Sequence, residues 1–192
     1  MVGRGLGIRR RLEFGGWLER WKRLFRRRFL GRRGELWRRG RQRELVGNMK
    51  SKEFINRLEE ARIVGAIAEA ERKSSGEIRV YVSHRKRTDP LAFAQKRFLE
   101  LGMTNTRHRN AVLIYLVPRT RQFAIVGDRG VHEKCGDAFW RDVTARMTDL
   151  LKQGRFTDAI LNAIQKVGDV LARNFPRDSE DQNELPDQIV RD

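Results

Sequence analysis

Three short polar segments each adjoin an apolar stretch, and they carry the side chains best suited to chemistry. The first ends in Glu77, the second ends in Asn110, and the third contains Asp128. Carboxylate and amide oxygens are the ligands that hard divalent cations take in proteins. We therefore predict a metal site for Ca²⁺ or Mg²⁺ at Glu77, Asp128 and Asn110.

Arginines flank the same polar positions. Arg109 precedes Asn110 and Arg129 follows Asp128, so both are predicted anion-binding residues, assisted by backbone N–H groups of the neighbouring glycines. A structural interpretation fits the pattern equally well. In that interpretation Glu77 pairs with an arginine, while the amide and the second carboxylate cap loops.

Other reactive residues give weaker signals. His132, Glu133 and Cys135 lie beside one another on a predicted short helix, and His84 and His108 lie on predicted loops without a partner at a recognisable spacing. A single cysteine allows neither a disulfide within the chain nor a cysteine-rich zinc site. The sequence also contains no Walker phosphate loop, no Gly-x-Ser-x-Gly motif and no metalloprotease histidine pair. Motifs therefore identify no catalytic residues, and these stay unknown.

The elements that must position the three polar segments are strands. Residues 78–82 alternate in polarity, 111–117 are continuously apolar, and 123–126 follow a tight turn. A helical pattern lies between the first two strands, which makes them parallel, whereas the short turn makes the third antiparallel. This topology brings the entrances of the first two strands and the exit of the third to one edge of the sheet.

Four helical patterns accompany the strands. The first starts near Asn56 and ends at 74–76, and the second runs from Asp89-Pro90 to Gly102. The third is predicted to start at Asp137 and the fourth to end before Phe175-Pro176. The α-β-α-β-β-α-α order predicts an α/β fold, a three-layer α/β/α sandwich whose small mixed sheet is covered by helices on both faces.

Charge divides the chain into three parts. The chain has 192 residues and a net charge of +17. Residues 1–48 are rich in Arg, Gly and Trp and hold 16 basic residues against four glutamates, whereas residues 178–192 hold six acids against one arginine. We interpret 1–48 as a basic extension, 49–177 as the folded domain, and 178–192 as an acidic tail that docks on the domain through its interspersed apolar residues.

The basic extension has three interpretations. Its aromatic and arginine residues recur at helical spacing, which is typical of a helix lying on a membrane surface, and they also suit a nucleic-acid backbone. The third interpretation is a start codon assigned too early, with Met49 as the natural beginning. No apolar run is long enough to cross a bilayer or to form a secretory signal. We therefore expect a cytoplasmic protein, peripheral to a membrane only through 1–48.

The order of these motifs resembles the TPM domain family, and in particular its short soluble bacterial members. The resemblance covers about 50–190 and excludes 1–48. It is carried by residues 74–80, 98 and 101–103, 109–113, 123–128 and 130–131, 139–140, 154–156, 175–176 and 183–187.

The resemblance implies an α/β/α sandwich and, from some members, divalent-metal binding. Acid phosphatase activity is attributed to a plant branch of the family. Asp128 departs from longer members, which usually carry an aromatic residue there. We expect a binding or accessory module for an unidentified protein or small molecule, with a dependence on a divalent metal. The alternatives are a metal-assisted phosphatase and a peripheral membrane protein.

Overall fold

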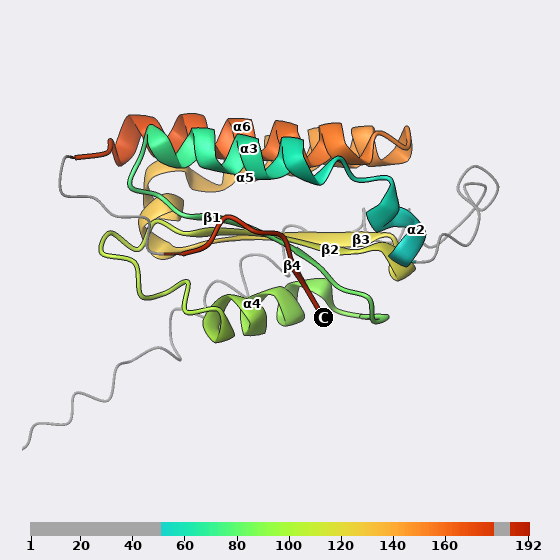
Figure 1. Cartoon of the computed structure of the whole chain (residues 1–192). Coiled ribbons are helices and arrows are strands. Elements are labelled where there is room, and N and C mark those ends of the chain that lie inside the picture. The colour runs from blue at the N-terminus through green and yellow to red at the C-terminus, as the bar shows by residue number, and fades with distance from the viewer. Residues whose placement is uncertain (1–50, 179–184) are drawn as a thin grey trace, which may run out of the picture. The chain divides into compact units, whose positions relative to one another are not determined.

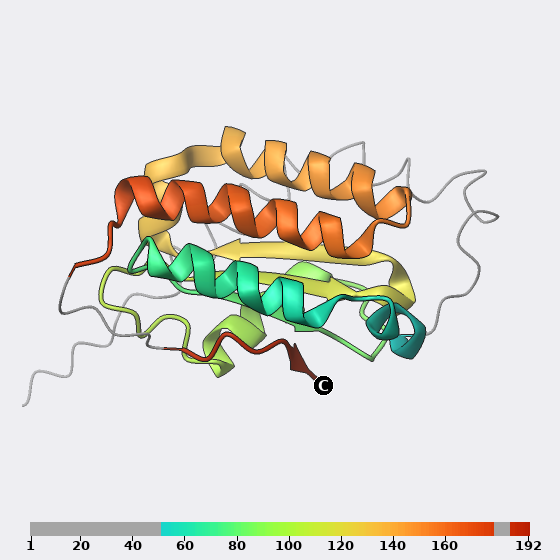
Figure 2. The same cartoon turned by 45° about the horizontal axis from the view of Figure 1, so that its top comes forward.

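The computed structural model describes residues 51–178 and 185–192. Its centre is a four-stranded mixed sheet in the order β3-β2-β1-β4. Helices α3, α5 and α6 cover one face of this sheet and α4 covers the other, as Figures 1 and 2 show. The described residues thus form the predicted three-layer α/β/α sandwich. The bounds of the elements are α2 Ser51–Asn56, α3 Glu60–Arg72, β1 Ile78–Val82, α4 Pro90–Glu100, β2 Val112–Val117, η1 Pro118–Thr120, β3 Gln122–Gly127, α5 Arg129–Lys152, α6 Phe156–Asn174 and β4 Val190–Arg191.

The sheet has the strand directions expected from the sequence. β1 and β2 are parallel, with Ile78 opposite Val112, and β2 and β3 are antiparallel, with Val112 opposite Gly127. The short helix η1 makes the turn between β2 and β3, and the next residue, Arg121, adopts a left-handed conformation with φ 53°. The start of β1, the start of β2 and the end of β3 therefore lie at one edge.

Two apolar clusters hold the three layers together. The larger cluster joins alternate residues of β1 and β2 to α3, α5 and α6, and its fully buried members include Ile63, Ile78, Ile114, Met147 and Leu171. The smaller cluster joins the opposite sheet face to α4 through Phe98, Met103, Leu113 and Tyr115 among others. Helices cover both faces of β1 and β2, which explains why these two strands are rich in apolar residues.

Two helix boundaries differ from the predictions. The predicted first helix corresponds to α3, which begins at Glu60 and not near Asn56, where a separate short helix, α2, ends. α5 begins at Arg129, capped by the Asp128 side chain, and not at Asp137. Its backbone is non-helical at Gly136, where φ is 65° and ψ is −178°. The predicted start at Asp137 therefore corresponds to the part of α5 that follows this kink.

The tail supplies a strand that the sequence pattern did not predict. β4 pairs in parallel with β1, placing Val190 opposite Tyr81 and Arg191 opposite Val82. Ile189, just before it, is buried in the larger apolar cluster. Figure 1 shows this segment in dark red along the free edge of β1. Val190 and Arg191 consequently form the edge strand beside β1.

Candidate functional site

The three predicted polar segments meet through backbone hydrogen bonds. The N–H of Val112 donates to the carbonyl of Glu77 at 2.7 Å, and the N–H of Asp128 donates to the carbonyl of Ala111 at 2.8 Å. The N–H of Gly130 donates to the carbonyl of Arg109 at 2.9 Å. The convergence follows from strand direction, since each segment enters or leaves the sheet at this edge.

Asp128 is held by an arginine from the neighbouring loop. Its two carboxylate oxygens accept hydrogen bonds from Arg109 Nε at 2.8 Å and Nη2 at 3.0 Å. One of these oxygens also accepts from the backbone N–H of Arg129 at 2.7 Å. The hydrogen bond from Arg109 to Asp128 raises the pKa of that guanidinium. Asp128 therefore fastens the start of α5 to the loop before β2.

The remaining predicted residues occupy different surroundings. Arg129 pairs with Glu133 on the surface of α5, and its side chain is 64% exposed. Asn110 is fully buried, and its amide nitrogen donates to the carbonyl and hydroxyl of Ser75. Its carbonyl oxygen Oδ1 is buried without a hydrogen bond. The metal role of Asn110 and Asp128 and the anion role of Arg109 and Arg129 stay predictions.

Glu77 lines a pocket together with two carboxylates that the sequence reasoning missed. The pocket has a volume of about 140 Å³ and includes Glu71 from the end of α3 and Asp187 from the tail. Its other lining residues are Ala68, Arg72, Ser74, Gly76 and Arg177. Three acidic groups from three separate segments thus face one small space, and two arginines lie at the same pocket.

The Glu71 carboxyl group has an unusual environment. One of its oxygens accepts the N–H of Ile78 at 2.9 Å, and the other is buried without a hydrogen-bond donor. Burial raises the pKa of Glu71 to about 9, and the negative charges of Glu77 and Asp187 add to this rise. The Ile78 hydrogen bond opposes the rise. At neutral pH Glu71 therefore carries a proton.

A buried arginine balances part of this acidity. Arg79 is 7% exposed on β1, and burial lowers its pKa while the charges of Glu77, Glu71 and Asp187 raise it. Its guanidinium remains cationic, because arginine is not deprotonated in proteins. The pocket therefore combines the protonated carboxyl of Glu71 with Glu77, Asp187 and the arginines Arg72 and Arg177, and the charge of Arg79 acts on the same acids.

The pocket has the oxygen ligands that a divalent cation prefers, but its side chains are not arranged around one point. Carboxylate oxygens are hard ligands, and the hydrogen-bond-free oxygen of Glu71 is available to one. Among the residues that the structure describes, however, no three His, Cys, Asp or Glu side chains already surround one point closely enough to hold a metal ion. Cation binding at this pocket would therefore require Glu71 to lose its proton and the carboxylates to draw together.

Sequence reasoning missed Glu71 and Asp187 for identifiable reasons. Glu71 lies in the last turn of α3, where an acidic residue usually faces water, and Asp187 lies in an acidic tail. One signal was present in the tail, where Leu185, Ile189 and Val190 interrupt the acidic residues. These apolar residues predicted that the tail docks on the domain, but they did not predict that Asp187 would line the pocket.

The weaker candidates are not gathered into a site. His132 Nε2 lies 3.9 Å from Asp137, and the His108 ring lies beside that of Phe175. Burial raises the pKa of the Cys135 thiol to about 11. These surroundings favour packing and surface roles, and the high thiol pKa disfavours a nucleophilic cysteine.

A family model and one solved structure agree with this architecture. The family model for the TPM domain matches residues 49–170. The chain is 37% identical to the BA42 protein of the psychrophilic bacterium Bizionia argentinensis, whose NMR structure superposes with a TM-score of 0.65 over 69% of this chain and 92% of that chain. An N-terminal domain from a P. gingivalis protein covers 70% of this chain and 81% of its own, at 20% identity and a TM-score of 0.48. A search of curated proteins found no match.

No helix within 51–178 or 185–192 has the length and apolar character that crossing a bilayer requires. The predicted membrane and nucleic-acid interactions of residues 1–48 lie outside the described residues.

Proposed function

The chain belongs to the TPM domain family, and from that premise we propose that it is a binding module that takes a divalent cation in the pocket of Glu71, Glu77 and Asp187. One observation supports this most directly. The Glu71 carboxyl group is buried beside two other acids; burial raises its pKa to about 9, and the charges of Glu77 and Asp187 add to the rise. A cation that replaced the proton would likewise neutralise the buried charge of Glu71 and offset its repulsion with Glu77 and Asp187.

The proposal keeps Glu77 as a ligand and adds Glu71 and Asp187. Asp128 is a weaker candidate because its oxygens already accept hydrogen bonds from Arg109 and Arg129. Asn110 Oδ1 is buried without a hydrogen bond, which leaves it open to a donor or a cation. Ca²⁺ and Mg²⁺ are the expected ions, since all these ligands are oxygens.

Titration of the full chain with Ca²⁺, Mg²⁺ and Mn²⁺ tests the proposal. Binding should release close to one proton near pH 7, because Glu71 must ionise to coordinate. The affinity should therefore rise with pH up to about the pKa of Glu71. Calorimetry in two buffers of different ionisation enthalpy measures this proton release.

Two variants locate the binding. Glu77→Gln should abolish binding, because the amide keeps the shape and loses the charge, whereas Glu69→Gln should leave it intact. Glu69 lies on the same helix as Glu71 but is exposed and paired with Lys73. Binding that survives Glu77→Gln would place the cation elsewhere, and an absence of binding to wild type would end the proposal.

The second candidate function is a metal-assisted phosphatase. The observation in its favour is that Arg72 and Arg177 line the same pocket as the carboxylates, since arginine is well suited to phosphate oxygens. Hydrolysis of an aryl phosphate by the full chain with each cation tests it. Activity that requires Glu77 but not Glu69 supports this function, and inactivity with every cation rejects it.

A further inference from the structure

The outer edge of β1 offers more backbone pairing than the tail uses. β1 contains the five residues Ile78–Val82, whereas β4 contains two and pairs with Tyr81 and Val82. The first three residues of β1 therefore have no strand partner on this side within the part of the chain that the structure describes. A sheet edge of this kind is a template for an extended segment of another chain.

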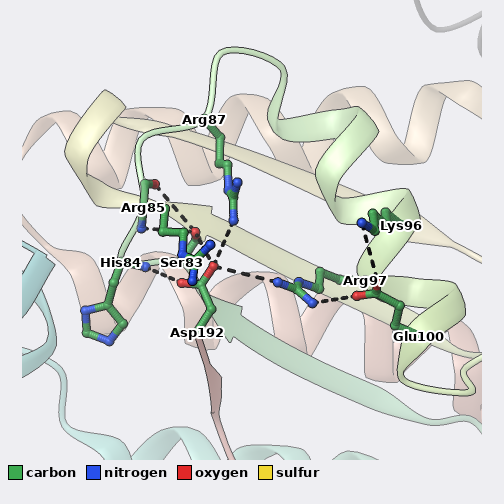
Figure 3. A network of polar contacts seen from close by, with 8 residues as sticks. All are labelled: Ser83, His84, Arg85, Arg87, Lys96, Arg97, Glu100 and Asp192. Atoms are coloured by element: carbon green, nitrogen blue, oxygen red, sulfur yellow. Dashed lines mark hydrogen bonds and ion pairs between the residues drawn. The ribbon is translucent and has the colours of Figure 1, made fainter.

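Four donors converge on one carboxylate where this edge ends, as Figure 3 shows. The Asp192 side chain accepts hydrogen bonds from Ser83 Oγ at 3.1 Å, the N–H of His84 at 2.6 Å and Arg87 Nη2 at 3.1 Å. Arg97 Nη2 approaches to 3.9 Å. Burial by itself would raise the pKa of Asp192, but these hydrogen bonds hold that pKa below its ordinary value. We call the four partners the Asp192 clamp.

The two arginines of the Asp192 clamp are ordered by contacts that do not involve the tail. The Arg87 guanidinium lies 4.1 Å from the centre of the Phe93 ring, and that of Arg97 lies 5.5 Å from the centre of the Tyr81 ring. Arg87 Nε is buried without a hydrogen-bond partner among the described residues. The clamp is therefore a preorganised site for a carboxylate, with one buried donor still unused.

An apolar contact and a basic surface adjoin the clamp. Ile189, three residues before Asp192, is 8% exposed and belongs to the larger apolar cluster. Arg85 and Lys86 are exposed on the loop that follows β1. The edge thus selects an extended segment with an apolar residue three positions before an acidic one, and the surrounding positive charge attracts acidic segments.

The tail occupies this edge with few regular interactions. A strand pairing of two residues offsets little of the entropy lost by ordering the backbone. The ion pair of Arg191 with Glu60 is on the surface, where such pairs contribute little. Its attachment to the domain gives the tail an effective concentration in the millimolar range. A separate segment that pairs along all of β1 makes backbone contacts that the tail lacks.

We propose that the β1 edge and the Asp192 clamp form a docking groove for an extended acidic segment of a partner protein, which adds to the sheet in place of β4. A carboxylate of the partner takes the position of the Asp192 carboxylate, and an apolar side chain takes that of Ile189. The chain's own tail then competes with the partner. This proposal goes beyond the proposed function and requires no cation.

Peptide binding to the full chain tests the proposal. The probe is a fluorescent, C-terminally amidated peptide with the sequence of residues 185–192, used without divalent cations. The double variant Ile189→Ser, Asp192→Asn weakens the tail's own hold on the groove. Fluorescence anisotropy should show at least tenfold tighter binding to this variant than to wild type, because the wild-type tail competes at its effective concentration. The single variant Asp192→Asn serves if the double variant does not fold.

Three further changes locate the bound peptide. The same peptide carrying Asp192→Asn should bind the double variant about tenfold more weakly, because it loses the charged hydrogen bonds. Arg87→Gln, added to the double variant, should have a similar effect, and Arg97→Gln replaces it if that protein does not fold. Arg62→Gln is the matched control, since Arg62 pairs with Glu59 on the surface, and it should leave binding unchanged.

Three results would overturn the proposal. The first is an absence of peptide binding to both tail variants, and the second is equal binding of the Asp and Asn peptides. The third is a wild-type dimer in sedimentation that Asp192→Asn abolishes, because the occupant would then be the tail of a second copy. None of these results depends on whether the pocket of Glu71 takes a cation, so the two proposals fail separately.

Discussion

The carboxyl groups of Glu71 and Asp187 line the same pocket, although one lies at the end of α3 and the other in the tail. Burial raises the pKa of Glu71 to about 9, and the neighbouring charges of Glu77 and Asp187 add to this rise. The proton makes Glu71 a neutral donor at neutral pH. Folding and the chemistry of the pocket therefore both depend on its ionisation.

Replacing Glu71 by Gln should stabilise the protein at pH 8 and weaken the dependence of its stability on pH. The pKa of Glu71 rises from 4.5 to about 9 in the fold. Between these values the folded chain holds a proton that the unfolded chain has released. The free energy of unfolding therefore falls as pH rises, by up to about 1.4 kcal/mol per pH unit. Gln keeps the donor and has no proton to lose.

Urea unfolding at several values between pH 5 and pH 9 measures this effect. Glu69→Gln is the matched control, because Glu69 lies on the same helix, is exposed and pairs with Lys73. It should retain the wild-type slope. A Glu71→Gln protein that is less stable than wild type at pH 8 would show that Glu71 is ionised in the fold.

Arg109→Ala should destabilise the protein by about 1–3 kcal/mol, the cost of leaving a charged buried group with fewer hydrogen bonds. Asp128 is 2% exposed and loses two donors, although it keeps the N–H of Arg129. Arg129→Ala is the control, since its pair with Glu133 is on the surface and should contribute less than about 1 kcal/mol. Equal losses in urea unfolding would contradict the structural role of the Arg109–Asp128 pair.

Gly130→Ala should cost about 1–3 kcal/mol through overpacking. A Cβ atom at Gly130 would lie 2.5 Å from the carbonyl oxygen of His108 and 2.8 Å from that of Arg109. Both are backbone atoms of a loop that cannot rotate away. Gly65→Ala meets nothing within 4 Å in α3 and should gain up to about 1 kcal/mol from helix propensity. Thermal unfolding distinguishes them, and a neutral Gly130→Ala would show that the loop adjusts.

Cys135 should react slowly with iodoacetamide while the protein is folded. Burial raises the pKa of its thiol to about 11, so the reactive thiolate at pH 8 is on the order of a hundredfold scarcer than in an unfolded chain. Alkylation followed by mass spectrometry with and without urea measures the ratio. Equal rates in both conditions would mean that this part of α5 opens readily.

The sequence by itself determined the kinds of elements and their directions. Alternating and continuous apolar runs specify β1 and β2, and Asp89 with Pro90 specifies the start of α4, where the Asp89 side chain accepts the N–H of Ala92. These signals are local, because each depends on neighbouring residues and on one period of the backbone. The short turn after β2 then sufficed to bring three polar segments to one edge of the sheet.

Only the tertiary structure decided which acids share a site. Glu71 reads as an ordinary residue of a helix end, and Asp187 and Asp192 read as members of a solvated acidic tail. Their roles follow from where the tail packs, and two paired residues in β4 leave no periodic pattern to detect. The burial of Glu71, its raised pKa and the hydrogen bonds of Asp192 arise from contacts between segments far apart in the chain, because desolvation and charge interactions depend on spatial neighbours and not on sequence neighbours.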